Sequence, residues 1–294
     1  MGWIWYLQVD FQLFVVGVFL LYLYSIKKVV MYIVTAILSL LSSIFIFIYV
    51  EINKYFVPAD MNEQSSDENF SYYIYNSPYG RCVPYLMGLA LGVMYMEYRS
   101  KLCNYIEEIK DKKEENVTIL GRVRNMLEER KFLRIAIEWF GIGLMVLVTF
   151  IVRPLQTGSH WPQEAHSFYL VLSKPVFIFG MILTVLPSIL GIRHSFFALI
   201  LNVKLFAWIA RISFCSYLVH LMVIVWYYYT RTYDVYYKFQ DTFATYMGLL
   251  TLSLFFGFIM TMLVELPFAN LLKLLMTGFK AKGRGADIVQ EKKS

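Results

Sequence analysis

Seven long runs of apolar residues dominate the sequence, and each approaches the roughly 20 residues that a helix needs to cross the ~30 Å hydrocarbon core of a bilayer. Charged residues make up only 16% of the chain, which is too few to cover the surface of a soluble domain, where about 25% is usual. The pattern predicts an all-α fold, a polytopic membrane helical bundle. The predicted spans are Trp5–Ile26, Val29–Val50, Cys82–Tyr98, Ile135–Val152, Pro175–Ile192, Ile212–Tyr229 and Phe243–Val264.

One further apolar stretch, residues 196–209, is shorter than a span and carries Asn202 and Lys204. We expect a short interfacial or re-entrant helix there. We expect the last span to stop near Glu265 and Pro267, because proline cannot continue the helical hydrogen-bond ladder.

The Lys and Arg residues predict the orientation, because they collect on the cytoplasmic side of membrane proteins. With seven spans and the N-terminus outside, most of the 27 Lys and Arg residues lie on the cytoplasmic side, as does the C-terminus. An eighth span at residues 196–209 would carry the basic tail outside and weaken this asymmetry. Asn69, in the pattern NFS, is then an outside glycosylation acceptor, whereas Asn116, in the pattern NVT, is cytoplasmic.

Two segments outside the spans differ in character from the membrane domain, which we place at residues 1–275. The cytoplasmic loop 99–134 mixes basic with acidic residues and is predicted to form a solvated or interfacial helix, with a docking site as the alternative. Residues 276–294 are predicted to be a disordered basic cytoplasmic tail, which anionic lipid would attract.

Polar side chains inside the spans are candidates for a functional site, because lipid makes them costly unless they are partnered or hydrated. Asp10 and Gln12 lie near the outer end of the first span, where they either line a substrate cavity or face other helices. His220 lies near the middle of the sixth span and shares a helix face with Tyr217. It either bonds across helices or contacts a substrate.

Arg211 and Glu265 mark the inner ends of the sixth and seventh spans. We expect the two side chains to lie within reach of each other, because an unpaired charge next to lipid is costly. Contact with lipid headgroups is the alternative.

The sequence contains no familiar catalytic template: no P-loop, GxSxG elbow, HExxH, CxxC or Rossmann glycine run. The 3 cysteines are too few and too scattered for a disulfide framework or a metal cluster, so we predict no metal site and no bound cofactor. The net charge of +6 follows the membrane topology, and we expect no nucleic-acid partner. The residues alone therefore indicate a helical membrane protein with a polar interior.

Four segments, in this order, resemble the acyltransferase 3 family, and within it the eukaryotic branch called nose resistant to fluoxetine. They are residues 2–14 (GWIWYLQVDFQLF), 81–92 (RCVPYLMGLALG), 210–220 (ARISFCSYLVH) and 264–268 (VELPF). Each falls on the span where the family has it, and together they cover nearly the whole chain.

The sequence also departs from the family pattern. Val9 stands where the family usually has Asn. No segment matches the opening spans of the family, with their Leu-Asp-Gly-Leu-Arg-like stretch and the downstream His thought to act as base, or the Cys-rich domain of this branch. We therefore expect the chain to be a C-terminal portion of the family's membrane domain, with little acyl transfer by itself, and to associate with another chain that covers the first span.

The resemblance implies an integral membrane acyltransferase of the plasma membrane or endoplasmic reticulum. Such an enzyme transfers an acyl group, other than aminoacyl, from acyl-CoA to a hydroxyl of a lipid or small-molecule acceptor. Arg193, Lys204 and Arg211 would meet the CoA phosphates at the cytoplasmic side. His220 is the candidate base within the membrane, although the resemblance places the family's base elsewhere. The substrate-binding candidates are Asp10, Gln12, Tyr217, His220, Arg211 and Glu265.

Other functions stay open at this point. A lipid or small-molecule (xenobiotic) transport protein could use the same membrane cavity. A seven-span receptor would share the orientation, but the motifs do not favour it, and an inactive relative or interaction partner is a further alternative.

Overall fold

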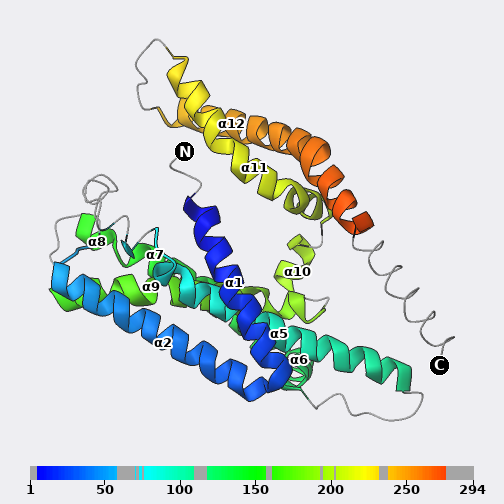
Figure 1. Cartoon of the computed structure of the whole chain (residues 1–294). Helices are drawn as coiled ribbons and strands as arrows, with labels where there is room; N and C mark the ends of the chain where they lie inside the picture. Colours follow the sequence, from blue (N-terminus) through cyan, green and yellow to red (C-terminus); the bar gives the residue numbers. More distant parts are fainter. Residues whose placement is uncertain are drawn as a thin grey trace, which may run out of the picture. The chain divides into compact units, whose positions relative to one another are not determined.

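The chain forms two helical units, residues 1–200 and 201–294 (Figure 1). The computed structural model describes residues 5–57, 70, 73–74, 76–108, 118–156, 161–192, 195–201, 203–231 and 238–275. Within these ranges every regular element is a helix, in agreement with the predicted all-α fold.

The first unit is a bundle built around five long helices, each of which contacts at least one of the others. α7 packs along α9, α2 contacts α5 and α9, and α1 crosses α2 and α5. The helices of this unit are α1 (Trp5–Ile26), α2 (Lys28–Asn53), α5 (Tyr79–Glu108), α6 (Ile119–Glu129), α7 (Lys131–Phe150), α8 (Arg153–Gln156) and α9 (Gln163–Ile189), and α10 (Phe196–Leu201) lies where the unit ends.

The second unit is a hairpin of two long helices packed side by side, α11 (Lys204–Tyr229) and α12 (Phe239–Met260) (Figure 1). A π-helical turn, η3 (Thr261–Glu265), follows α12 directly, and residues 266–275 continue as α-helix.

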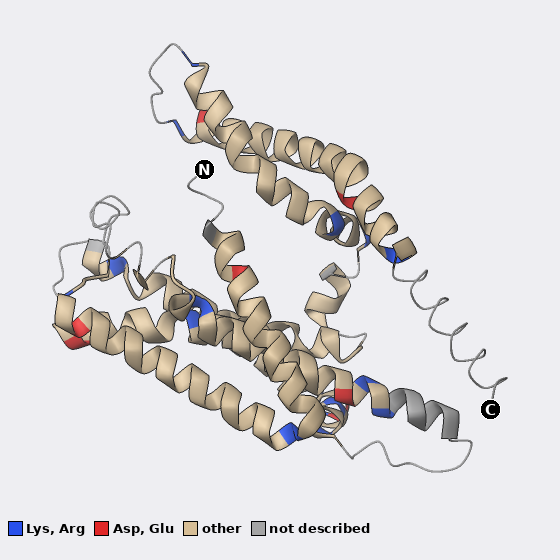
Figure 2. Ribbon diagram, viewed as in Figure 1, with Lys and Arg blue, Asp and Glu red and all other residues tan. Residues whose placement is uncertain are grey.

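Within the part of the chain that the structure describes, six helical segments are long and apolar enough to cross a membrane: Tyr6–Ile26, Lys28–Asn53, Lys131–Leu155, Gln163–Ile189, Lys204–Tyr229 and Phe239–Leu275. α2, for example, has no charged residue between Lys28 and Glu51 (Figure 2). The predicted span Cys82–Tyr98 does form part of a helix, α5, but this helix is not among the six. The total of seven spans therefore stays a prediction.

Burial in the bundle has the pattern of a membrane protein, with small and polar residues between helices and large apolar ones outside. On α9, Ser167 and Thr184 are buried, whereas Phe168 and Leu172 are 54% and 50% exposed. On α1 and α2, Phe11 and other large side chains are likewise exposed. Such a surface is stable against hydrocarbon and unfavourable against water, so the helices belong in a bilayer.

A buried apolar cluster and a polar clamp join α1, α2 and α5. The cluster consists of Leu20, Met31, Leu86 and Val93. Near the α1–α2 turn, the Tyr24 hydroxyl donates to Glu97 Oε1 at 2.7 Å, and Lys28 Nζ lies 3.1 Å from the same oxygen. The clamp holds the charge of Glu97 close to a cation, as a carboxylate at this position requires.

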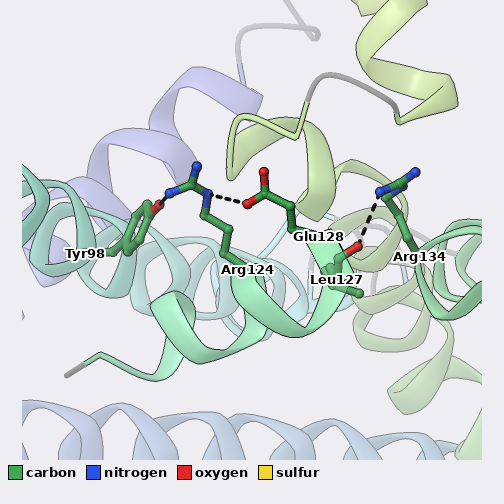
Figure 3. A network of polar contacts seen from close by, with 5 residues as sticks. All are labelled: Tyr98, Arg124, Leu127, Glu128 and Arg134. Carbon is green, nitrogen blue, oxygen red and sulfur yellow. Dashed lines mark hydrogen bonds and ion pairs between the residues drawn. The ribbon is translucent and has the colours of Figure 1, made fainter. Parts of the chain in front are cut away.

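Most of the described residues in the predicted loop 99–134 are helical. α5 extends through Glu108, and α6 lays its apolar face, with Leu120 and Leu127, on the ends of α5 and α9. Arg124 donates to the Tyr98 hydroxyl at 3.2 Å and lies 3.7 Å from Glu128, while Arg134 donates to the Leu127 carbonyl at 3.3 Å (Figure 3). These contacts fix α6 against α5 and α7.

Two expectations about helix ends are wrong. The stretch 196–209 is not one short helix, because α10 ends at Leu201 and α11 already begins at Lys204. The last helix does not stop at Pro267 but continues through residue 275. The π turn explains why: the amide of Leu266 bonds to the carbonyl of Thr261, five residues back, and the wider turn accommodates a proline that has no N–H to donate.

Candidate functional site

A polar cavity of about 470 Å³ lies in the first unit, between α1, α5, α7 and α9. α1 contributes Tyr6 and Asp10, α5 contributes Arg81, and α9 contributes Lys174. The remaining lining residues are Val9, Leu13, Pro84, Tyr85, Val148, Ser173, Phe177 and Ile178. The cavity thus combines charged groups with apolar walls, as sites for small molecules commonly do.

The charged groups of this cavity are held by neighbouring backbone and rings. Lys174 Nζ donates to the carbonyl of Gly80 at 2.9 Å, at the first turn of α5. The Arg81 guanidinium lies over the Tyr6 ring at 5.3 Å from its centroid and is close enough to Lys174 to repel it electrostatically. Asp10 is the one acidic residue among those that line the cavity. Two cations therefore share the cavity with one carboxylate.

The two predicted candidates on α1 differ in position. Both side chains are exposed, but Asp10 is among the residues that line the cavity and Gln12 is not. Residues two apart point to nearly opposite sides of a helix, which explains the difference. The other four candidates, Tyr217, His220, Arg211 and Glu265, belong to the second unit.

In the second unit, the carboxylate of Glu265 bonds to groups other than Arg211. Its Oε2 accepts from Cys215 Sγ at 3.2 Å and from Thr261 Oγ1 at 3.3 Å. Arg211 is exposed, and among the described residues no ion pair joins it to Glu265. The expected pair is therefore not formed, because the π turn aims Glu265 at the buried face of α11, where Cys215 lies one turn beyond Arg211.

His220 has a ring geometry that leaves one nitrogen lone pair available. Its Nδ1 forms a hydrogen bond with the carbonyl oxygen of Tyr217. The centroids of the His220 and Tyr217 rings are 5.3 Å apart. A carbonyl can only accept, so Nδ1 carries the proton and Nε2 of the neutral ring is an acceptor. A positioned ring with a free Nε2 can take a proton.

His166 has the opposite arrangement. Its Nδ1 accepts from the amide of Val57 at 3.0 Å, and the side chain is buried between the rings of Phe56 and Trp161. The lone pair is used in fixing the backbone, so His166 has a structural role. His160 and His194 lie outside the described residues.

A buried acid escaped the sequence analysis. Glu138, on α7, is 1% exposed, and its Oε1 accepts from Ser195 Oγ at 2.5 Å. Ser195 in turn lies 3.3 Å from the Ser188 hydroxyl. The serines partner the carboxyl, and no group of three or more His, Cys, Asp or Glu within the described ranges could hold a metal.

The cavity cations also escaped the sequence analysis. The predicted span begins at Pro175, one residue after Lys174, but α9 begins at Gln163 and contains both residues. Arg81 was noted only as the first residue of a family-like segment. A cation directly before an apolar run, on each of two helices, was the signal that could have found them.

The helices and the polar cavity define a multi-pass integral membrane protein. Residues 1–264 match the acyltransferase domain of the acyltransferase 3 family, and the chain belongs to that family. The membership indicates a membrane acyltransferase. Comparison with curated proteins gave no match, and comparison with solved structures gave none either.

Proposed function

We propose that the protein transfers an acyl group, other than aminoacyl, from acyl-CoA to a hydroxyl of a lipid or small-molecule acceptor. The observation that carries this proposal is the family match, which extends over residues 1–264. The four segments quoted above favour the eukaryotic branch called nose resistant to fluoxetine, and with it the plasma membrane or endoplasmic reticulum.

The reaction needs a base and cations at defined places. The acceptor oxygen attacks the thioester carbonyl, the C–S bond breaks, and the CoA thiolate leaves while a base removes the hydroxyl proton. A free alcohol is a poor nucleophile at neutral pH, so the base matters, and His220 supports this role through its free Nε2. Lys204 and Arg211 are both exposed on α11, seven residues apart and thus on one face, and would hold the CoA phosphates.

The polar cavity of the first unit is the proposed acceptor site. Asp10 can accept a hydrogen bond from an acceptor hydroxyl, and Lys174 and Arg81 can donate to its oxygens. Gln12, Tyr217 and Glu265 stay predicted substrate contacts.

An acyl-transfer assay tests the proposal. Membranes that contain the protein are incubated with radiolabelled acyl-CoA and hydroxyl acceptors, and both free CoA and labelled ester are measured. We expect equal amounts of the two products. Asp10→Asn should raise the acceptor KM about tenfold, the cost of about one charge-assisted hydrogen bond. Gln8→Ala, on an exposed part of the same helix, should leave it unchanged. Release of CoA without ester would contradict acyl transfer, whereas turnover no higher than in membranes without the protein would agree with the low activity expected of a C-terminal portion by itself.

The membrane topology is a separate proposal, with the N-terminus outside and the C-terminus cytoplasmic. The distribution of Lys and Arg supports it. Asn69 should therefore carry a glycan that glycosidase removes, with loss of the gel shift in Asn69→Gln. Asn116→Gln should not change the shift, because the oligosaccharide transferase acts on the outer side only. A glycan on Asn116 would show that the orientation is reversed.

A further inference from the structure

A second hollow adjoins the polar cavity. It is a groove of about 460 Å³ along α7 and α9, and Trp161 and Pro162 are among the residues that line it. Val148 and Ser173 line both hollows, so the groove begins where the polar cavity ends. The walls of the groove are almost wholly apolar. The two hollows together have one charged end and one apolar arm.

The charged end favours a ligand with both signs of charge. Arg81 and Lys174 line the same cavity, and two cations repel each other more strongly beside lipid or protein than in water. A phosphate between them would replace the repulsion with charge-assisted hydrogen bonds, since both side chains have several donors. Asp10, in the same cavity, disfavours a second negative charge and favours an ammonium group.

We propose that the two hollows bind a zwitterionic phospholipid. The phosphate lies between Arg81 and Lys174, the headgroup ammonium faces Asp10, and one acyl chain fills the groove between α7 and α9. An apolar groove by itself would accept any chain, and the charges decide the class of headgroup. The proposal goes beyond acyl transfer, because binding is measured without turnover. A diacyl phosphatidylcholine has no free hydroxyl, so an acceptor of this class for the acyl transfer proposed above is a lysophospholipid.

A binding experiment with the purified full chain in detergent tests the proposal. Native mass spectrometry measures the dissociation constants of four probes: dioleoyl phosphatidylcholine, dioleoylglycerol, dihexanoyl phosphatidylcholine and inorganic phosphate. Dioleoyl phosphatidylcholine should bind at least ten times more tightly than each of the others, because only it has both the headgroup and the long chains. Equal binding of dioleoylglycerol would overturn the proposal, since it would show a nonspecific apolar surface. Equal binding of inorganic phosphate would also overturn the proposal, since it would show that the site binds an anion and does not recognise a lipid.

Variants separate the headgroup from the chain. Lys174→Gln should raise the dissociation constant of dioleoyl phosphatidylcholine about tenfold, which corresponds to ~1.4 kcal/mol of binding free energy. Lys174→Arg should retain most of the affinity. Arg153→Gln removes an exposed cation of the same unit outside both hollows and is the matched control, with no change expected. Ala165→Phe places a large side chain in the groove. It should lower the affinity for the long-chain lipid but not the affinity for dihexanoyl phosphatidylcholine.

Two comparisons make the outcome decisive even if one variant folds poorly. Asp10→Asn should lower the affinity for phosphatidylcholine. It should leave the affinity for phosphatidylglycerol unchanged, because that lipid has no ammonium group. Lys174→Gln and Arg153→Gln should unfold at the same temperature while differing in affinity. If the two have the same affinity as the wild type, or if Ala165→Phe weakens both chain lengths equally, the proposed binding site is wrong.

Discussion

Replacement of His220 by alanine is expected to lower kcat/KM for acyl transfer by about 10²–10⁴-fold, or ~3–5 kcal/mol of transition-state stabilisation. The reason is geometric. Nδ1 donates to the Tyr217 carbonyl, so the ring is held in one orientation and one tautomer with Nε2 free. His220→Gln should lose nearly as much, because an amide can form hydrogen bonds but cannot take a proton. The measurement is steady-state acyl transfer with acyl-CoA in excess.

His166 provides the matched control for this prediction. Its Nδ1 is used by the Val57 amide, so His166→Gln, whose side chain can also accept that bond, should leave kcat/KM unchanged. Equal activity of His220→Ala and wild type would show that the base lies elsewhere, as the family resemblance implies. This result would not contradict acyl transfer itself, because the product assay tests acyl transfer independently of the identity of the base.

Gly257→Ala is expected to separate the two helices of the second unit. A Cβ on Gly257 would lie 2.6 Å from the Cα and 2.7 Å from the nitrogen of Ser216, and backbone atoms cannot give way as a side chain can. The Ser216 hydroxyl is buried at this contact with no hydrogen-bond partner among the described residues. Forced overpacking of this kind costs about 1–3 kcal/mol, and Gly257→Leu should cost more.

Gly248→Ala is the control on the same helix. A Cβ at Gly248 would meet no atom within 4 Å, so the variant should stay within about 0.5 kcal/mol of wild type. Thermal unfolding in detergent measures both, and a cysteine cross-link across α11 and α12 would report their separation. Equal unfolding temperatures for Gly257→Ala and Gly248→Ala would mean that the helices are not in close contact at Ser216.

The sequence was sufficient to predict that the protein is a membrane protein and where most of its helices lie. Apolar length alone predicts a span, because every backbone polar group in lipid must be satisfied within a helix. It also marked Asp10, since a carboxylate in such a run is costly wherever it lies. The family resemblance was confirmed over residues 1–264, while its finer branch stays a prediction.

The partners of the polar groups could not be read from the sequence. Glu265 and Arg211 end adjacent predicted spans, yet a single π turn directs Glu265 to Cys215 and Thr261. Glu138 is partnered by Ser195, which lies 57 positions along the chain. Such contacts depend on helix rotation and on local turns, and a shift of one residue along an α-helix redirects a side chain by about 100°.

The sequence by itself therefore determined that the protein is helical, lies in the membrane and belongs to its family, because these depend on local apolarity and on motifs. Only the tertiary structure decided that Arg81 and Lys174 meet Asp10 in one cavity and that a groove continues from it. The physical reason is that α1, α5 and α9 supply one or two groups each. No helix carries the cavity alone, so the site exists only once the three pack together.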